Sequence, residues 1–347
     1  MAKAIRNIVV VGPGAVGGTT AGMLFRKGYD VTLVCKYPEV AAKIRDEGIR
    51  IHGLGKDLQV KIPATASLKE LKGTFDLVLL ATKATDMAET AREVVPFLHE
   101  QSKVVSMQNG IMEEELSGIV GRERTVGCVV GFGATMEAYG SIELTSHGDM
   151  WLGYMDRDPD PQLEEISEIL GEVTTTHTVK RILPTRYAKL IINSCTSTLG
   201  VITGMELGQL LKKKQARKLF VQVGLEAIRV ADAMGLQVPP YGGRIHFRTI
   251  LNSPGPVRHL AIRIIGIRYK RMKSTNLQSL ERGGVTEIEY LNGYIVDRGI
   301  SLDIQTPVNQ KLLEMVREIE NKERPITPNN LEEIKYGISS MVPVDAS

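Results

Sequence analysis

Ile8-Val9-Val10-Val11-Gly12-Pro13-Gly14-Ala15-Val16-Gly17, residues 8–17, joins a β-branched run to the motif G-x-G-x-x-G, and a helical pattern follows to about Lys27. In such a segment the first glycine makes a tight turn, the second lets backbone amides approach a pyrophosphate, and the third permits close helix–sheet packing. The helix N-terminus adds partial positive charge for the phosphates. A purely structural glycine turn is the alternative, but the position between strand and helix favours a dinucleotide site. The residues predicted to bind the cofactor here are Gly12, Pro13, Gly14, Ala15, Val16 and Gly17.

The end of the second strand-like run bears on the choice of dinucleotide. An NAD-preferring site usually has Asp or Glu there, roughly 20 residues after the glycine motif, to bind the ribose 2′-hydroxyl. Here the run ends Val34-Cys35-Lys36-Tyr37, without an acid. Lys36 suits a 2′-phosphate, so we expect NADP(H) as the cofactor. A solvated surface lysine is the alternative interpretation of Lys36.

The first half of the chain alternates strand-like and helix-like segments. Phe75–Ala81 is almost wholly apolar, as expected of a strand buried on both faces of a parallel sheet. Residues 124–155 are β-branched and Gly-rich, which predicts antiparallel strands, with Glu172–Arg181 as a further strand. The alternation indicates an α/β fold with a Rossmann-like dinucleotide-binding domain over residues 1–183. The other expected strands are Val31–Cys35 and Lys103–Met107, and the expected helices are Glu39–Glu47 and Asp86–Leu98.

After Pro184 the pattern becomes mostly helical, which predicts an all-helical C-terminal domain over residues 184–323. Residues 324–347 are rich in Pro, Asn and Ser, so this C-terminal extension either straps onto the domain or is partly disordered. The helices expected in the second domain are Arg186–Leu199, Ala216–Met234, Glu287–Asp297 and Thr306–Asn321.

Composition argues against several classes of protein. Of the 347 residues, 43% are hydrophobic and 24% are charged, which is ordinary for a globular protein. The net charge of +3 is too small to indicate nucleic acid, and no apolar run is long enough for a transmembrane helix. Cys35, Cys128 and Cys195 lie far apart, which argues against a disulfide scaffold and a zinc site. Since no targeting segment stands out, we expect a cytoplasmic protein without a metal.

One helical stretch of the second half carries candidate chemistry. Lys189 and Asn193 are four residues apart and therefore share a helix face, which also carries Arg186. An isolated lysine is usually solvated, so this pair alone does not decide a role for Lys189.

The segment Thr286-Glu287-Ile288-Glu289 is typical of a capping box that opens another helix. In this interpretation Thr286 is the N-cap and Glu289 occupies N3, which leaves Glu287 free of the capping role. A carboxylate near a helix N-terminus is already stabilised by the helix dipole, so structure alone is sufficient to explain Glu287.

Five motifs follow one another along the chain: residues 12–17, Thr82-Lys83-Ala84, Gln108-Asn109-Gly110, the helix with Lys189 and Asn193, and residues 273–293 (KSTNLQSLERGGVTEIEYLNG). In this order they resemble the ketopantoate reductases (2-dehydropantoate 2-reductases). No single motif is highly specific, but the five in register extend over most of the chain. The resemblance implies NADPH-dependent reduction of a 2-oxo acid to a 2-hydroxy acid, with the active site in a cleft between the two domains.

The resemblance also implies roles for particular residues. Lys189 matches the family's catalytic lysine, the general acid that protonates the carbonyl oxygen as hydride reaches carbon. Glu287 matches a catalytic glutamate that supports the lysine or the substrate hydroxyl and lies near the cofactor. Asn193 matches a substrate-binding asparagine. Asn109 and Lys83 match positions near the nicotinamide ribose and the cofactor, and we count Asn109 with the substrate-binding residues as well.

Two positions depart from the family's pattern. Ser197 stands where members commonly carry an asparagine. Thr275-Asn276-Leu277-Gln278-Ser279 replaces an SMLQD-like segment, and Thr275 falls where a serine usually contacts the substrate carboxylate. Thr275 keeps a hydroxyl, so Ser197 and Thr275 remain substrate-binding candidates in a changed pocket.

A basic stretch is the third departure. Ala233–Leu280 has no Asp or Glu in 48 residues. We hypothesise a cationic rim at the substrate cleft, suited to an anionic substrate larger than ketopantoate; a surface or oligomer-contact segment is the alternative. We expect neither a membrane nor a nucleic acid as partner. The eight basic residues are Arg244, Arg248, Arg258, Arg263, Arg268, Lys270, Arg271 and Lys273.

The expected reaction is therefore ketopantoate to pantoate, a step toward pantothenate and coenzyme A, in a homodimer formed through the helical domain. One alternative is a paralogue that reduces another 2-oxo acid, for which Ser197 and Thr275 are the discriminating features. Another is a non-catalytic NADP(H)-binding sensor. Because a sensor needs only the cofactor site, the presence of Lys189, Asn193 and Glu287 together argues against it.

Overall fold

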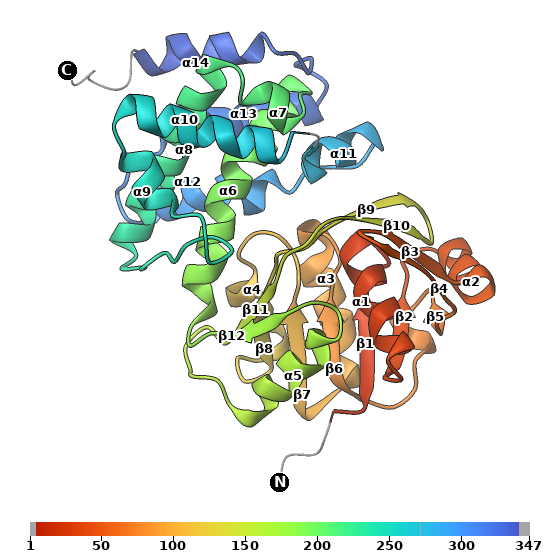
Figure 1. The fold of residues 1–347 in the computed structure, drawn as a ribbon. Helices are drawn as coiled ribbons and strands as arrows, with labels where there is room; N and C mark the ends of the chain where they lie inside the picture. Colours follow the sequence, from red (N-terminus) through yellow and green to blue (C-terminus); the bar gives the residue numbers. More distant parts are fainter. Residues whose placement is uncertain (1–4, 271, 340–347) are drawn as a thin grey trace. The chain divides into compact units, whose positions relative to one another are not determined.

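β1 (Asn7–Val11) lies within an eight-stranded sheet in the computed structural model, which describes residues 5–270 and 272–339 (Figure 1). β1 has parallel neighbours on both sides, β2 (Asp30–Val34) and β6 (Phe75–Leu80). The predicted α/β class is confirmed, because helices alternate with these parallel strands. Beyond β2 the sheet ends with β5 (Ala64–Thr65), and beyond β6 it continues with β7 (Leu98–Ser106), β8 (Thr125–Val130), β11 (Met150–Gly153) and β12 (Thr176–Thr178).

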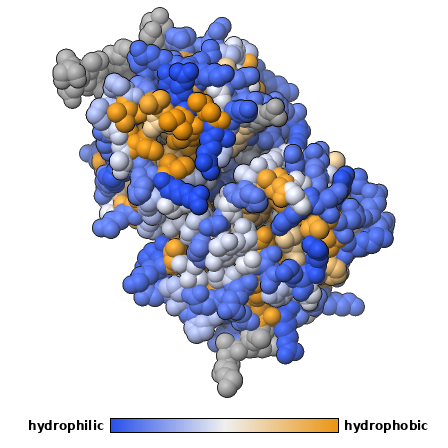
Figure 2. Space-filling view, in the orientation of Figure 1, coloured by the Kyte–Doolittle hydropathy of each residue, from blue (hydrophilic) through white to orange (hydrophobic). Residues whose placement is uncertain are grey.

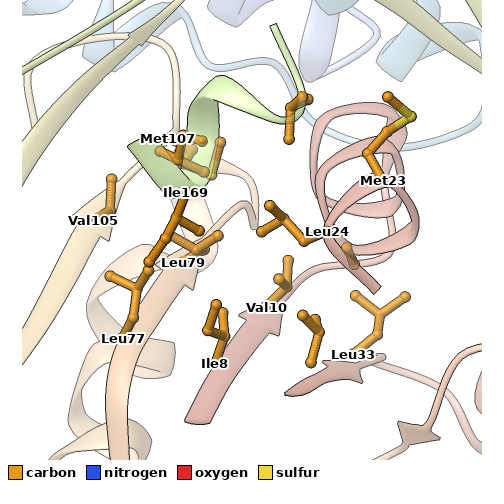
Figure 3. Packing of buried hydrophobic residues seen from close by; sticks show 14 of the residues in the cluster. Ile8, Val10, Met23, Leu24, Leu33, Leu77, Leu79, Val105, Met107 and Ile169 are labelled. Carbon is orange, nitrogen blue, oxygen red and sulfur yellow. The ribbon is translucent and has the colours of Figure 1, made fainter. Parts of the chain in front are cut away.

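Helices cover this sheet. α1 (Ala15–Arg26) and α5 (Pro161–Gly171) pack against each other, and their apolar side chains meet alternate side chains of the strands (Figure 3). Ile8, Val10 and Leu79 lie in this cluster with Leu24 of α1 and Ile169 of α5. Every residue of β6 is buried, as its apolar sequence predicted for a strand covered on both faces. The other helical segments of this part are α2 (Pro38–Glu47), η1 (Leu68–Glu70), α3 (Ala84–Val94), η2 (Val95–Phe97) and α4 (Glu113–Val120).

A second, four-stranded sheet contains part of the strand-rich region predicted over residues 124–155. Its order is β4 (Lys56–Val60), β3 (Ile49–Gly53), β10 (Ser141–Ser146) and β9 (Gly133–Ala138). The prediction of antiparallel strands over residues 124–155 is confirmed, because β9 pairs antiparallel with β10, and β8 pairs antiparallel with β11. The prediction did not include two parallel pairs, of β8 with β7 and of β10 with β3. A Cβ at Gly22 would lie 2.9 Å from Ile51 Cδ1, so α1 packs closely on this sheet.

Several element boundaries between residues 84 and 181 also differ. The helix expected over Asp86–Leu98 is α3, and it ends before Pro96 because proline lacks the N–H that a helix interior needs. The strand expected over Glu172–Arg181 is shorter than predicted, because it consists of the three residues of β12, and α5 precedes it. Asp160 caps α5, since its Oδ1 accepts a hydrogen bond from Leu163 N–H at 2.8 Å. An N-cap aspartate followed by proline is a helix-start signal that the sequence analysis missed.

The chain divides into two compact units, Met1–Arg186 and Tyr187–Ser347. α6 (Ile182–Thr203) begins in the first unit and continues in the second. Apart from an isolated bridge between Tyr241 and Ile245, the described part of the second unit is helical, as predicted. Its other helical segments are α7 (Leu207–Leu210), α8 (Lys214–Ala233), α9 (Phe247–Asn252), α10 (Gly255–Arg268), α11 (Thr275–Glu281), η3 (Ile288–Tyr290), α12 (Asn292–Ser301), α13 (Pro307–Glu320) and α14 (Asn330–Ser339).

Residues 324–339 pack back onto the second unit. α14 contacts α8 and α13, and Asn330 Nδ2 donates hydrogen bonds to Ile202 O at 2.8 Å and to Pro325 O at 3.0 Å. The described part of the C-terminal extension is therefore a strap, and residues 340–347 lie outside the described residues.

The described residues bear on three further expectations. None of their helices combines the length and apolarity needed to cross a bilayer. Among the described residues, no three His, Cys, Asp or Glu side chains lie close enough together to hold a metal ion. The three cysteines are buried free thiols, and burial raises the pKa of Cys35 to about 12.

Candidate functional site

The glycine motif forms a tight turn between β1 and α1. Gly12 has φ +110°, and a Cβ there would lie 2.7 Å from the backbone carbonyl carbon of Ala81. A Cβ on Gly17 would collide with the carbonyl oxygen of Gly12. Both positions therefore require glycine, as expected of the first and third glycines of a dinucleotide motif.

Gly14 has open surroundings. It is the N-cap of α1, and no atom lies within 4 Å of a Cβ built there. No side chain caps the helix, and the first turn of α1 contains no acidic residue. Open space in front of uncapped backbone N–H groups suits a pyrophosphate, so this turn fits NAD(P)(H). Pro13, Ala15 and Val16 are partly exposed along the same turn.

Lys36 follows β2, and its side chain is exposed. Its Nζ lies 3.2 Å from Oδ2 of Asp86, in the first turn of α3. The hydrogen bond from Lys36 to this carboxylate raises the pKa of Lys36. Asp86 therefore places a negative charge beside the lysine expected to bind a 2′-phosphate. Asp86 was not predicted as a partner of Lys36, because it lies 50 positions further along the chain.

A hydrogen-bond network joins the loops that carry Lys83 and Asn109. Gln108 Nε2 donates to Thr82 Oγ1 at 3.3 Å, and Ser106 Oγ donates to Gln108 Oε1 at 3.0 Å. The two loops follow β6 and β7, which are neighbours in the sheet. Lys83 is exposed at the N-cap of α3, and Asn109 is half-buried. The structure thus brings these two predicted cofactor-binding residues to one edge of the sheet.

Arg186 anchors this network from the start of α6. Its guanidinium donates to Glu113 Oε1 at 2.6 Å, to the carbonyl oxygen of Gln108 at 2.5 Å and to that of Ser106 at 2.6 Å. The Arg186 side chain is 1% exposed and that of Glu113 is 0% exposed. Arg186 was predicted to share a helix face with Lys189, but its guanidinium binds the loop before α4.

In the second unit, α6 carries Lys189, Asn193, Ser197 and Gly200 in one stripe, since steps of four, four and three residues return to the same helix face. Lys189 and Asn193 are half-buried, and Ser197 is buried. A Cβ on Gly200 would lie 3.2 Å from the Cβ of Ser274, the N-cap of α11. The stripe therefore ends where α11 begins.

Asn276 connects α11 to Glu287. Its Oδ1 accepts a hydrogen bond from Glu287 N–H at 3.0 Å. The side chain is 2% exposed, and within the described part of the chain its Nδ2 has no hydrogen-bond acceptor. Thr275, next to it, is exposed as the first residue of α11. Asn276 was not among the predicted site residues, and its only signal was the departure from the SMLQD-like pattern.

Asn292 holds the start of α12 against α6. Its Nδ2 donates to Ser194 O at 3.4 Å, and its Oδ1 accepts from Thr198 Oγ1 at 2.5 Å. Ser194 and Thr198 each follow a predicted substrate-binding residue on α6. These contacts bring α6, α11 and the Glu287 segment together within the second unit.

The capping box predicted at Thr286 is wrong. Thr286 Oγ1 accepts from Ile288 N–H at 3.2 Å within a 3-10 turn, and α12 begins only at Asn292. Glu289 does not reach back to the turn, because Arg317 of α13 binds both of its carboxylate oxygens, at 2.6 and 2.7 Å. The helix expected over Glu287–Asp297 is therefore interrupted.

Two family models match this chain, one in each of its two units. The family described as "Ketopantoate reductase PanE/ApbA" matches residues 8–157, and "Ketopantoate reductase PanE/ApbA C terminal" matches residues 181–320. The chain belongs to the ketopantoate reductase family. The resemblance inferred from the motifs is confirmed, and the protein is an NAD(P)-dependent oxidoreductase of 2-oxo acids.

Members of the ketopantoate reductase family resemble this chain over nearly their whole length. The "2-dehydropantoate 2-reductase" of Pyrococcus abyssi is 29% identical over 317 residues, which are 90% of this chain and 97% of that protein. A PanE/ApbA family ketopantoate reductase from Ralstonia eutropha JMP134 is 30% identical with a TM-score of 0.78, over 91% of this chain and 99% of that one. D-mandelate dehydrogenase in complex with NADH and anilino(oxo)acetate has the same TM-score and coverage at 22% identity, a likeness of fold.

The basic stretch of this ketopantoate reductase family member is not uniform. Arg248 Nη1 donates to Asp232 Oδ2 at 2.9 Å. Arg263 and Arg268 are exposed on α10, and Arg271 lies outside the described residues. A cationic rim at the substrate site stays a prediction.

Proposed function

We propose that this chain reduces 2-dehydropantoate (ketopantoate) to pantoate with NADPH, as a step toward pantothenate and coenzyme A. The observation that carries the proposal is the assembly of α6, which bears Lys189 and Asn193, with α11 and the Glu287 segment. The 2-dehydropantoate 2-reductase of Pyrococcus abyssi, similar over 90% of the chain, supports the same substrate.

Lys189 is the proposed proton donor. Addition of hydride to a ketone carbon builds negative charge on the oxygen, and a nearby ammonium group stabilises that charge and delivers the proton. Half-burial of Lys189 limits the water that competes for this interaction. Glu287 is proposed to support the lysine or the substrate hydroxyl.

The substrate's other groups have their own proposed partners. Asn193 and Ser197 are one and two turns beyond Lys189 on the same stripe of α6, and we assign them to the substrate. Thr275 is assigned to the substrate carboxylate, and its exposure at the first turn of α11 leaves its hydroxyl accessible. Asn109 is assigned both to the substrate and to the cofactor.

The cofactor-binding residues belong to the first unit, apart from Glu287. The reduced nicotinamide, when bound, supplies the hydride. The open turn at Gly14 is proposed to hold the pyrophosphate, and Lys36 the 2′-phosphate. Lys83 and Asn109 are proposed to lie near the nicotinamide ribose. The pairing of Lys36 with Asp86 predicts an NADPH preference weaker than that of an unpaired lysine.

Reduction of a different 2-oxo acid is the second candidate. The observation that favours it is Asn276, a buried polar side chain with an unpartnered Nδ2 in place of the methionine of the SMLQD-like pattern. The side chain of Ser197 is also shorter than the asparagine that is common at this position, which leaves more space for a substrate.

The deciding experiment is turnover of purified protein with NADPH, followed by the absorbance of the reduced nicotinamide. Ketopantoate is compared with a panel of 2-oxo acids that includes aromatic and dicarboxylic members. We expect ketopantoate to have the highest kcat/KM, and Lys189→Ala to lower kcat at least about 100-fold, the usual range for loss of a general acid. Lys180→Ala, an exposed lysine, is the matched control.

Each outcome separates the candidates. Efficient turnover of another acid with weak turnover of ketopantoate supports the second candidate. NADPH binding without turnover of any acid contradicts both candidates and favours a sensor. Lys189→Ala activity equal to that of Lys180→Ala contradicts the role of Lys189 as proton donor.

A further inference from the structure

Basic side chains converge at the start of α8. Lys214, Arg217 and Lys218 lie in the first two turns of this helix. α10 contacts α8 and adds Arg258 and His259 to the same place. In the part of the chain that the structure describes, none of the four lysine and arginine side chains forms an ion pair. Positive charge that no carboxylate balances attracts anions from solution.

Three nitrogen atoms of this cluster are buried without a hydrogen-bond partner among the described residues. They are Arg217 Nε, Arg258 Nε and His259 Nδ1. Backbone oxygens hold the two guanidinium groups in place, since Arg217 Nη1 donates to Leu211 O at 2.8 Å and Arg258 Nη1 donates to Leu251 O at 2.9 Å. Most buried polar atoms in folded proteins have a partner, so three in one cluster indicate a place where water or a ligand supplies it.

The start of α8 also has the wrong charges for an isolated helix. A helix N-terminus carries partial positive charge, so acidic residues stabilise it and basic residues do not. α8 has 20 residues, yet no side chain caps it and its first turn contains no acidic residue. Burial lowers the pKa of His259, and the charges of Arg217, Arg258, Lys214 and Lys218 lower it further. An anion bound here would offset both the helix dipole and the repulsion between these cations.

This cluster lies away from the proposed catalytic lysine. Tyr187 Oη donates to Ala227 O at 3.0 Å and Cys195 Sγ donates to Phe220 O at 3.3 Å, so α8 runs antiparallel to α6. The start of α8 is therefore level with the end of α6, roughly 15 Å along the helix axis from Lys189. Lys189 also follows Tyr187 by two residues, which turns a helix by about 200°, so its stripe faces away from α8.

The number of cations indicates the class of ligand. One phosphate group carries a charge of about −2, so two phosphate groups balance the four cations. Guanidinium groups suit phosphate in particular, because their N–H donors match its oxygens in pairs. We propose that the start of α8 and the facing residues of α10 bind a small soluble molecule that carries two phosphate groups. The half-buried Arg217, Arg258 and His259 form a compact cluster, whereas a nucleic acid strand needs an extended basic surface.

An acidic membrane surface is the ligand that the experiment has to exclude. α10 exposes Val257 and Leu260 beside Arg258 and His259. Figure 2 shows a hydrophobic patch bordered by hydrophilic surface where Figure 1 draws α10. Apolar and basic residues together are typical of helices that lie on anionic lipid. The buried nitrogen atoms favour the small anion, because a lipid surface would meet the exposed lysines first.

The first test measures the binding of sodium diphosphate to the full-length protein by isothermal titration calorimetry at constant ionic strength. NADPH is present at a saturating concentration, so that the cofactor's own phosphates occupy the glycine turn of the first unit. The wild type should bind diphosphate at least about tenfold more tightly than inorganic phosphate, because the second phosphate adds charge-assisted hydrogen bonds. Equal affinity for the two anions would contradict a site for two phosphate groups.

Substitutions in α10 test the position of the site. Arg258→Gln should raise the Kd for diphosphate at least about tenfold, because it removes a guanidinium from the cluster. Arg263→Gln is the matched control, since it removes the same charge from an exposed position of the same helix, outside the cations that act on His259. Its Kd should stay within about twofold of the wild type. A wild-type Kd in Arg258→Gln overturns the proposal.

The second test uses Lys214→Gln/Lys218→Gln, which changes two exposed lysines and should leave the fold intact. This variant should bind diphosphate at least about tenfold more weakly than the wild type. In a low-salt chloride buffer without phosphate its Tm should be higher than that of the wild type, because two repelling charges leave the helix N-terminus. A lower Tm would contradict the repulsion on which the proposal depends.

Two further ligands complete the experiment. Vesicles of phosphatidylcholine and phosphatidate, and a DNA duplex, are offered to the wild type under the same conditions. Binding of either one without saturable binding of diphosphate overturns the proposal, as does a wild type that binds none of the three. Neither test measures turnover, so each result is independent of the proposed reaction.

Discussion

Arg186 donates from Nε to Glu113 Oε1 across 2.6 Å, although 73 residues separate them in the chain and both side chains are buried. A buried ion pair gains little net stability, because the cost of removing two charges from water offsets their attraction. The guanidinium also binds the backbone oxygens of Ser106 and Gln108, directly before Asn109. The pair is therefore better suited to setting the conformation of this loop than to stabilising the fold.

Replacing the pair in two steps separates these effects. Arg186→Met should cost about 3–5 kcal/mol in the free energy of unfolding, because it leaves Glu113 buried and unpaired. The double variant Arg186→Met/Glu113→Met should recover most of that stability in urea unfolding. It should not recover NADPH affinity, measured by nucleotide fluorescence, because the loop carbonyls still lack their donor. Arg181→Met, which breaks an exposed pair with Asp158, is the control and should change stability by less than about 1 kcal/mol. Full recovery of NADPH affinity in the double variant would show that the pair is only structural.

Alanine at Gly12 should lower the stability of the protein, whereas alanine at Gly14 should weaken cofactor binding. Gly12→Ala should destabilise the protein by several kcal/mol, because φ is +110° and the Cβ meets the backbone of Ala81. Gly14→Ala should leave thermal unfolding unchanged, because φ is −67° and the Cβ enters open space. If that space holds a pyrophosphate, the KM for NADPH should rise at least about tenfold in Gly14→Ala. Wild-type KM in a folded Gly14→Ala protein would argue against this position for the phosphates.

Lys36 and Asp86 should control the choice between NADPH and NADH. Lys36→Ala should raise the KM for NADPH about tenfold and leave that for NADH nearly unchanged, because only NADPH carries a 2′-phosphate. Asp86→Asn should lower the KM for NADPH a few-fold, since it removes the negative charge 3.2 Å from Lys36 Nζ. The measurement is the ratio of kcat/KM for the two cofactors. Equal changes for both would mean that Lys36 binds no phosphate.

Asn276→Ala should lower kcat/KM about tenfold, because Glu287 N–H loses the acceptor that holds it at 3.0 Å. Gln278→Ala is the control on the same helix, since its side chain donates to the Lys273 carbonyl. Stability measured alongside should fall little, because the substitution also removes the unpartnered Nδ2. If the two variants have the same kcat/KM, Asn276 has no positioning role.

Glu226 should make stability depend on pH. Burial raises the pKa of Glu226, although its oxygens accept hydrogen bonds from Val308 N–H at 3.0 Å and Asn309 N–H at 2.9 Å. The folded state therefore binds this proton more tightly than the unfolded state. The stability that protonated Glu226 contributes is fully present below pH 4.5, the pKa of this group in the unfolded state. This stability is lost as the pH rises through the pKa of Glu226 in the folded state. Relative to Glu226→Gln, the wild type should lose about 1.4 kcal/mol per pH unit within that window, measured by urea unfolding. A difference that is constant with pH would contradict the assignment.

Features that neighbouring residues specify could be predicted from the sequence, and features that depend on distant residues could not. The turn at Gly12 and the apolar strand β6 were predicted, because neighbouring residues specify them. The pairing of β10 with β3 was not, since it joins segments about 90 residues apart and either strand has several suitable partners. The capping box failed at Glu289 because Arg317, far along the chain, offers a stronger partner than the local backbone.

The candidate site divides in the same way. Lys189, Asn193 and Glu287 were predicted as site residues because they belong to motifs. Asn276 and Asp86 were missed, since their importance comes only from contacts with Glu287 and Lys36. A buried polar group is recognised as unpartnered only when its surroundings are known.

The passage of α6 through the boundary between the two units constrains how this protein can be recombined with its relatives. A chimaera joined ahead of Ile182 would take Arg186 from one parent and Glu113 from the other. If the parent that supplies α6 has neither Arg nor Lys at the position of Arg186, Glu113 of the hybrid would be buried without a cation to pair with. Crossovers placed after Arg186 keep the two residues together, so the first turn of α6 is inherited with the nucleotide-binding half of the gene.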